Sequence, residues 1–125
     1  MISTDNSTKY PLNRRQVAKQ IVETGGDNFL LISGLGSPNW DFTAAGDRDT
    51  FFPLWGAMGG AVPIGLGLAI AQPQKRVLVA TGDGEMLMGL GSLATVGLQE
   101  PKNLVINNLY YGFLNCICWR PYKTH

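Results

Sequence analysis

The sequence predicts an α/β fold, a three-layer, doubly wound and mostly parallel sheet. Two apolar runs, residues 29–32 and 77–80, show no polar alternation, which is typical of parallel strands covered on both faces. The second run leads through a Gly-rich turn, residues 82–85, into an apolar-rich segment, residues 86–98, with the order strand, turn, helix. At 125 residues, with 45% hydrophobic and 15% charged residues, the chain has the composition of one globular domain.

The N-terminal part is expected to contribute one helix. Residues 1–11 are mostly polar and are predicted to be a flexible lead-in. Asn13 and Gln16 have the spacing of a capping box, and the predicted helix ends at Gly25-Gly26. Its narrow apolar stripe consists of Val17, Ile21 and Val22, and its solvated face of Arg14, Arg15 and Lys19.

The first apolar run leads into the loop 33–38, whose backbone N–H groups and Ser37 hydroxyl could meet phosphate oxygens. A dinucleotide-binding fingerprint would require glycine in place of Asn39 and a helix that begins at this point, so that interpretation is rejected. Residues 40–49 are expected to form a loop over the mouth of the sheet, with solvated charges.

Residues 51–55 are a candidate short strand, followed by a second strand-to-helix turn and a Gly- and Ala-rich helix. Each glycine inside a helix costs about 1 kcal/mol relative to alanine, so a close approach of backbone to a ligand or another helix is expected. The glycines concerned are Gly56, Gly59, Gly60, Gly65 and Gly67.

The turn Gly82-Asp83-Gly84-Glu85 is the strongest candidate site. Free N–H groups at a helix N-terminus attract a phosphate, and a divalent cation such as Mg²⁺ would reconcile that phosphate with the Asp83 carboxylate. Gly-Asp-Gly is also an ordinary turn sequence. However, ligands bind at the carboxyl ends of parallel strands, and Asn107-Asn108 follow a short predicted strand, residues 104–106. Glu85 is expected in the first turn of the helix, where the helix dipole favours a carboxylate.

This arrangement resembles the thiamine diphosphate-dependent enzymes, whose cofactor motif begins Gly-Asp-Gly and closes with Asn or Asn-Asn. The resemblance extends through Gly56-Ala57-Met58-Gly59 and covers residues 12–112, which would form a partial diphosphate-binding domain, incomplete at the C-terminus. Residues 82–103 most resemble sulfopyruvate decarboxylase of the beta-subunit type and phosphonopyruvate decarboxylase. Residues 113–125 resemble nothing in the family, and the chain looks truncated.

The resemblance implies thiamine diphosphate and Mg²⁺ as cofactors. Asp83, Asn108 and the main-chain carbonyl of Tyr110 would be the metal ligands, and Met58 would hold the two cofactor rings in a bent conformation while the Gly56 carbonyl accepts from the aminopyrimidine. From the residues alone, the interpretation of Met58 as a core residue is favoured. The full set of implied cofactor-binding residues is Gly36, Ser37, Gly56, Ala57, Met58, Gly82, Asp83, Gly84, Glu85, Asn108 and Tyr110.

The resemblance also implies a partner. In the family a glutamate on a pyrimidine-binding domain protonates the cofactor's pyrimidine ring, and 125 residues do not supply that domain. The chain is therefore expected to be one subunit of an oligomeric 2-oxo acid decarboxylase, inactive alone, with the helix 86–98 buried between the sheet and a neighbouring chain. The alternatives are an acetolactate synthase-like subunit and a truncated remnant without catalytic function.

Composition and charge limit which other partners, cysteine sites and cellular locations are expected. A net charge of +1 gives no reason to expect a nucleic acid or an anionic membrane as partner. Two cysteines, Cys116 and Cys118, are too few for a disulfide scaffold or a zinc site. No secretory signal and no apolar run of membrane-spanning length is visible, so a cytoplasmic location is expected.

Overall fold

A single mixed sheet organises the chain. The computed structural model describes residues 13–110 and 113–117. In this part of the chain the strand order is β2-β1-β3-β4-β5; the first four strands run parallel and β5 pairs antiparallel with β4. The strands are β1 (Phe29–Ser33), β2 (Phe51–Pro53), β3 (Arg76–Gly82), β4 (Leu104–Tyr110) and β5 (Phe113–Ile117).

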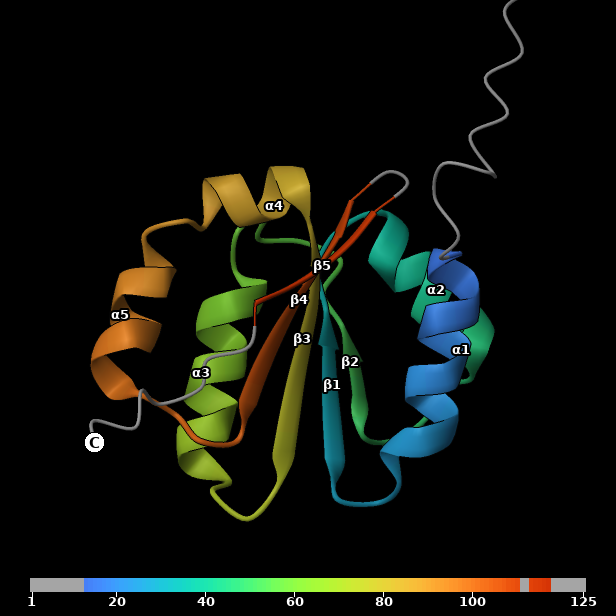
Figure 1. Cartoon of the computed structure of the whole chain (residues 1–125), viewed down its shortest axis with the longest axis horizontal. Helices are drawn as coiled ribbons and strands as arrows, with labels where there is room; N and C mark the ends of the chain where they lie inside the picture. The colour runs from blue at the N-terminus through green and yellow to red at the C-terminus, as the bar shows by residue number, and fades with distance from the viewer. Residues whose placement is uncertain (1–12, 111–112, 118–125) are drawn as a thin grey trace, which may run out of the picture.

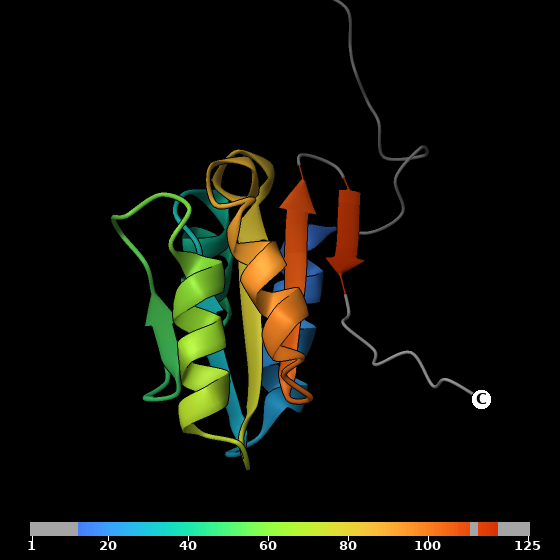
Figure 2. The same ribbon diagram turned by 90° about the vertical axis from the view of Figure 1, so that its left-hand side faces the viewer.

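Helices cover both faces of the sheet, which confirms the predicted three-layer α/β fold (Figure 1). One face carries α1 (Arg14–Gly25) and α2 (Ser37–Ala45). The other face carries α3 (Ala61–Ala71) and α5 (Ser92–Gln99), which lie side by side in Figure 2. The short helix α4 (Asp83–Met88) lies at the end of the sheet where β3 terminates.

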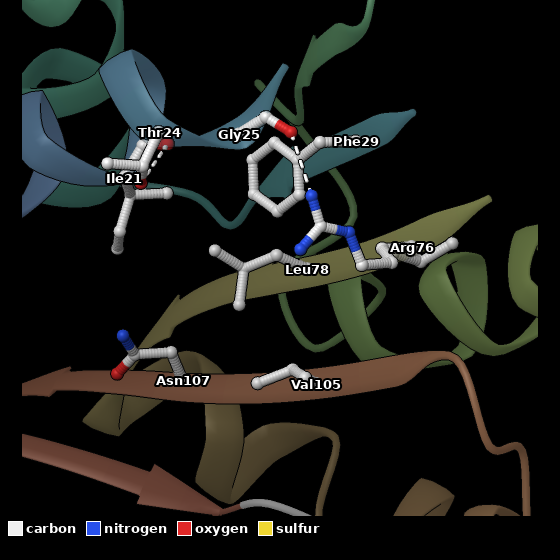
Figure 3. Close-up of a pocket in the computed structure, with 9 residues that line it drawn as sticks. Ile21, Thr24, Gly25, Phe29, Arg76, Leu78, Val105 and Asn107 are labelled. Carbon is white, nitrogen blue, oxygen red and sulfur yellow. Dashed lines mark hydrogen bonds between the residues drawn. The ribbon is translucent and has the colours of Figure 1, made fainter. Parts of the chain in front are cut away.

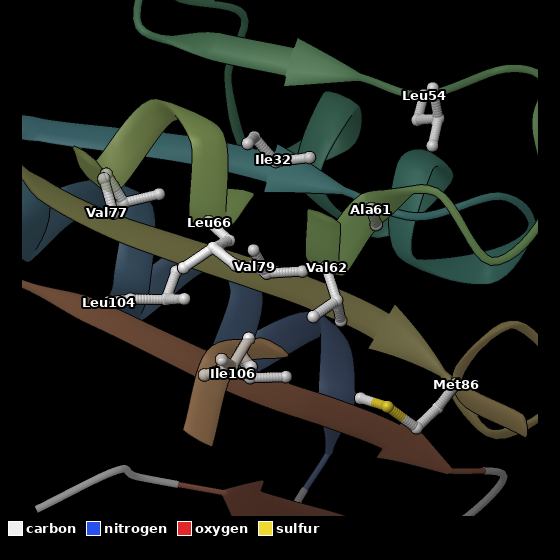
Figure 4. Close-up of a cluster of buried hydrophobic side chains, with 12 residues drawn as sticks. Ile32, Leu54, Ala61, Val62, Leu66, Val77, Val79, Met86, Leu104 and Ile106 are labelled. Atoms are coloured by element: carbon white, nitrogen blue, oxygen red, sulfur yellow. The ribbon is translucent and has the colours of Figure 1, made fainter. Parts of the chain in front are cut away.

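The central strand β3 explains the absence of polar alternation in its sequence. Val77 and Val79 pack into a core beneath α3 and α5 (Figure 4), whereas Leu78 and Ala80 pack into a second core beneath α1 and α2. All four side chains are buried. Because both faces of the strand are covered, apolar residues are favoured at every position.

The first helix forms as predicted, with one difference at its cap. The Asn13 side chain accepts a hydrogen bond from the Arg15 N–H at 2.9 Å, so it caps the second helical residue rather than Gln16. At the other end Gly26 has a φ of +67°, a conformation that glycine adopts without steric cost.

The segment predicted to be a loop over the mouth of the sheet is largely helical. Helix α2 begins at Ser37 and has a proline in its first turn, where the missing N–H costs nothing. The prediction that no helix begins near Pro38 and Asn39 was therefore wrong, although the third glycine of a dinucleotide fingerprint is still missing. The predicted solvated charge was also wrong for Asp41, whose side chain is 1% exposed.

The buried Asp41 carboxylate is held from α1. Its Oδ2 lies 2.7 Å from Arg14 Nε and its Oδ1 lies 3.5 Å from Arg15 Nε. A buried carboxylate requires such a partner. Arg14 is therefore part of the contact between α1 and α2 and not a purely solvated residue, which corrects the prediction.

The predicted helix over residues 86–98 is broken into two. α4 ends at Met88 and α5 begins at Ser92. At the break, a Cβ added to Gly89 would stand 2.3 Å from the Gly59 carbonyl oxygen, so two backbones meet there. Several apolar side chains of this segment are exposed in the single chain, namely Leu87, Met88, Leu90 and Leu98, and their burial against a neighbouring chain stays a prediction.

The strand predicted to end at Ile106 continues to Tyr110. Asn107 pairs with Ala80 and Asn108 with Thr81, so both asparagines lie within the parallel ladder rather than beyond it. The prediction of a short strand with the asparagines in the following loop was wrong. Among the described residues, no helix has both the length and the apolar character needed to cross a bilayer.

Candidate functional site

Three loops meet where the parallel strands end. They contain residues 34–36 after β1, residues 54–60 after β2, and residues 82–84, the short junction at which β3 passes directly into α4. Because parallel strands present their carboxyl ends at one edge, these loops form one side of the molecule together with α4 (Figure 1). The predicted residues from Gly36 to Gly84 lie in these loops or in the first turns of the helices that follow them.

Met58 lies at the rim of this side, next to the Gly-Asp-Gly turn. Its Cε stands 3.4 Å from the position of a Cβ added to Gly84. Met58 is 45% exposed, so the alternative that it is a core residue is wrong. Two segments about 25 residues apart in the sequence are thereby in contact.

The loop that carries Met58 is a tight turn. The Gly60 N–H donates to the Ala57 carbonyl at 2.8 Å, and Gly59 at the third position has a φ of +92°. This is the pattern of a type II turn, which favours glycine at that place. Ala57 itself has a φ of +52°, and both Gly56 and Ala57 are exposed. The backbone of this loop is therefore accessible.

Glu85 turns away from the solvent. It is 2% exposed, and its Oε2 accepts from the Thr81 hydroxyl at 3.1 Å. Its Oε1 accepts from the Ala61 N–H, the first of α3, at 3.3 Å. The carboxylate thus lies beneath the turn and holds neighbouring segments.

A second buried polar network supports the loop after β1. Asn39 donates from Nδ2 to the Leu54 carbonyl at 2.7 Å, and the Ser33 hydroxyl donates to its Oδ1. Asn39 and Ser33 are fully buried. From the sequence, Asn39 served only to exclude a dinucleotide site, and this structural role was not predicted. A polar residue soon after a buried strand was the available signal.

The predicted metal ligands are arranged unevenly. Asp83 is exposed in the first turn of α4, whereas Asn108 pairs with Thr81, two residues earlier along the sheet. Two residues of strand correspond to about 7 Å. The Asn108 Oδ1 is buried and has no hydrogen-bond partner among the residues that the structure describes. Tyr110 ends β4 one position beyond the Leu109–Gly82 pair.

Two further residues predicted to bind the cofactor lie at the start of α2. Gly36 has a φ of +100° and is exposed, and Ser37 is the first residue of α2. Within residues 13–110 and 113–117, no group of three or more His, Cys, Asp or Glu side chains could hold a metal ion by itself. A metal here would therefore need oxygens from other sources, such as amides, main chain or a phosphate.

A cavity of about 310 Å³ lies away from these loops, against the half of the sheet where β3 begins (Figure 3). It is lined from the end of α1 by Ile21 and Thr24, and from β4 by Val105 and Asn107. Arg76 bridges its edge by donating to the Gly25 carbonyl at 3.0 Å. The cavity shares no lining residue with the three loops described above, so it is not the predicted site.

Comparison with known proteins supplies the family. Residues 37–116, more than half of the chain, match the family described as thiamine pyrophosphate enzyme, C-terminal TPP binding domain. The sulfopyruvate decarboxylase subunit beta of Methanocaldococcus jannaschii is 42% identical over 106 residues, which cover 82% of this chain and 55% of that protein.

Two further relatives have related names. The subunit beta of Methanothermobacter thermautotrophicus sulfopyruvate decarboxylase is 46% identical over 77 residues, covering 62% of this chain and 41% of that protein. The phosphonopyruvate decarboxylase of Streptomyces viridochromogenes is 47% identical over 75 residues, covering 60% of this chain and 19% of that protein. The chain thus spans about half the length, or less, of these relatives.

The matched residues include the α2 start, the Met58 loop, the Gly-Asp-Gly turn and β4. The three-layer fold and the three loops at the ends of its parallel strands agree with that match. The chain therefore belongs to the thiamine pyrophosphate enzymes, and its residues 37–116 match their C-terminal TPP-binding domain.

Proposed function

We propose that the chain is the thiamine diphosphate- and Mg²⁺-binding subunit of a 2-oxo acid decarboxylase and works with a pyrimidine-binding partner chain. The observation that carries the proposal is the contact of Met58 with the Gly82–Gly84 turn in a domain of this family. That contact unites an accessible backbone, an exposed apolar side chain and an exposed carboxylate at one edge of the sheet.

The residues present fit a hard cation and a diphosphate. Asp83 offers an exposed carboxylate, and the Oδ1 of Asn108, which has no partner within the described part of the chain, is a neutral oxygen donor. Both are ligand types that Mg²⁺ prefers. Mg²⁺ also retains phosphate and water ligands, so it does not need three acidic side chains. The Tyr110 carbonyl is the third protein ligand in this proposal.

The other residues bind and orient. The exposed backbone of Gly56 and Ala57 offers hydrogen-bonding groups, and Met58 supplies an apolar surface that excludes water from one side. When bound, thiamine diphosphate supplies the electron sink that decarboxylation of a 2-oxo acid requires. In this proposal Gly36 and Ser37 lie beside the cofactor, whereas Glu85 acts from beneath the turn.

An exposed apolar surface at the same end supports a partner chain. Its members lie on the loop after β2 and on and after α4, and each is at least 45% exposed: Trp55, Met58, Leu87, Met88 and Leu90. Clustered exposed apolar side chains mark interaction surfaces. The word subunit in the names of the relatives also supports a partner. Their names further support substrates with a second anionic group, such as sulfopyruvate or phosphonopyruvate, over the acetolactate synthase alternative.

The proposal is tested by reconstitution. The purified chain is mixed with the partner subunit of the Methanocaldococcus jannaschii enzyme, and CO₂ release from sulfopyruvate, phosphonopyruvate and pyruvate is measured with thiamine diphosphate and Mg²⁺. We expect release that is lost in Asp83→Ala. No release with any substrate, although the same partner is active with its own beta subunit, would contradict the decarboxylase assignment.

A further inference from the structure

Glu85 is a buried charged side chain whose placement the proposed cofactor chemistry does not explain. It lies two residues after Asp83 in α4, yet it is 2% exposed and points beneath the turn. Burial of a carboxylate is costly unless hydrogen bonds compensate for the lost water. Its contacts therefore indicate what it does in this fold.

The first contact is with the start of α3. Gly60 precedes this helix and provides no side-chain cap, so the first N–H groups of α3 lack a local partner. Glu85 Oε1 accepts the Ala61 N–H at 3.3 Å from a position 24 residues away. A negative charge at this place is also favoured by the dipole of the eleven-residue helix. Because α3 directly follows the turn 57–60, Glu85 fixes the end of the Met58 loop.

The second contact is with the strand before the Gly-Asp-Gly turn. Glu85 Oε2 accepts from the Thr81 hydroxyl at 3.1 Å, and Thr81 is fully buried. This bond joins the first turn of α4 to the last part of β3. Asp83 lies between the two residues and is therefore held from both sides.

The third contact is with the loop after β1. A Cβ added to Gly34 would stand 1.6 Å from Glu85 Oε2, so only glycine leaves room for the carboxylate. The Gly34 N–H in turn donates to the Ala80 carbonyl at 2.7 Å, which ties this loop to β3. One side chain thus lies against the first loop at Gly34 and bonds to Ala61 and Thr81, the residues that directly flank the other two loops.

We infer that Glu85 is a positioning residue, which holds the Gly34 loop, the Met58 loop and the Asp83 turn in the geometry that binds the cofactor. This inference rests on the proposed function, because it concerns the affinity for thiamine diphosphate. Glu85 does not touch the cofactor in this account. It acts through Asp83 and through the loop that ends at Ala61.

Two variants test the inference by different routes. Glu85→Gln keeps the shape but offers one acceptor oxygen to two donors, and Gly34→Ala keeps the carboxylate but displaces it. Glu23→Gln is the control, because the Glu23 side chain is 60% exposed on α1. Binding of thiamine diphosphate with Mg²⁺ is measured by calorimetry at a temperature where circular dichroism shows each variant fully folded.

We expect Glu85→Gln and Gly34→Ala each to raise Kd about tenfold, in line with the loss of a buried charged hydrogen bond. The double variant should be little worse than either single one, because both act on the same carboxylate. The Ala61 amide resonance of the cofactor-free chain should also move in both single variants. Glu23→Gln should bind like the wild type.

A purely structural role would lower the melting temperature and leave Kd of the folded variants unchanged, and that result would overturn the inference. If Glu85→Gln does not fold, the melting temperature and the Kd of Gly34→Ala test the inference in the same way. A folded wild-type chain that binds no cofactor would instead overturn the proposed function, and the positioning role with it. The wild-type titration therefore separates the two failures.

Discussion

At the scale of single residues, the candidate site depends on polar side chains that are buried below it rather than on those that face the solvent. Glu85 and Asn39 are at most 2% exposed, and each joins segments distant in sequence. Exposed residues such as Asp83 and Met58 can contact a ligand, but their positions follow from these buried supports. Loss of the hydrogen-bond partner of a buried polar group costs more folding free energy than loss of a contact at the surface.

The Asn39 network provides a direct test of this point. Asn39→Ala removes the bond to the Leu54 carbonyl and leaves the buried Ser33 hydroxyl without its acceptor. We expect the free energy of unfolding to fall by about 2–4 kcal/mol. Urea titration followed by circular dichroism measures it. Asn28→Ala, at an exposed position, should change the value by less than about 0.5 kcal/mol, and equal losses would contradict the account.

The two arginines near Asp41 offer a matched comparison. Arg14 is 32% exposed and lies 2.7 Å from the buried carboxylate, whereas Arg15 is 77% exposed and lies 3.5 Å from it. We expect Arg14→Ala to cost about 2 kcal/mol or more, because it weakens the compensation of a buried charge. Arg15→Ala should cost less than about 1 kcal/mol. Thermal unfolding of both variants would refute the ranking if Arg15→Ala were the more damaging change.

At the scale of elements, the glycines of α3 differ in what they do. A Cβ on Gly65 would stand 2.1 Å from Val79 Cγ2 in the centre of the core, whereas a Cβ on the exposed Gly67 would meet no atom of the described residues within 4 Å. The close approach expected from the sequence is therefore present at Gly65 and absent at Gly67. Only Gly65 is needed for helix–sheet packing.

Replacement of these two glycines by alanine should change the free energy of unfolding in opposite directions. Gly67→Ala should raise the free energy of unfolding by about 0.5–1 kcal/mol, since alanine is the better helix former. Gly65→Ala should lower it by about 1–3 kcal/mol through overpacking against Val79. Denaturant unfolding of both variants checks the prediction, and stabilisation by Gly65→Ala would show that the contact with β3 is looser than the structure indicates.

The elements that the sequence predicts correctly are those determined by local pattern. The strands around 29–32 and 77–80 are continuous apolar runs, and α1 has a cap and a terminal glycine pair. Helix α2 was missed because the burial of Asn39 and Asp41 depends on partners in other elements. The break after Met88 was missed for the same reason, since it depends on Gly59.

The site itself was predictable in part. The Gly-Asp-Gly turn and the Met58 loop could be named from the sequence because their motifs are short and contiguous. The register of β4 could not, because it is set by pairing with β3, and that pairing places Asn108 beside Thr81. The grouping of Asn108 and Tyr110 with Asp83 around a metal is part of the proposal.

At the scale of the whole molecule, the candidate site lies on one side of the fold. Four parallel strands end there and α4 lies across their ends (Figure 1). The loop after β2 and α4 also carry exposed apolar side chains. A domain of this family with such a surface is expected to bind a second chain through it. Cofactor binding by this side is the claim on which the proposed subunit role depends.

The most direct measurement is a calorimetric titration of the folded chain with thiamine diphosphate, with and without Mg²⁺, repeated on Asp83→Ala. The account predicts binding that requires Mg²⁺ and that weakens at least about tenfold in the variant, because a metal-bound carboxylate is lost. Asp83 is exposed, so its removal should leave the fold intact. No binding by the folded wild-type chain, or binding indifferent to both Mg²⁺ and Asp83, would contradict the account.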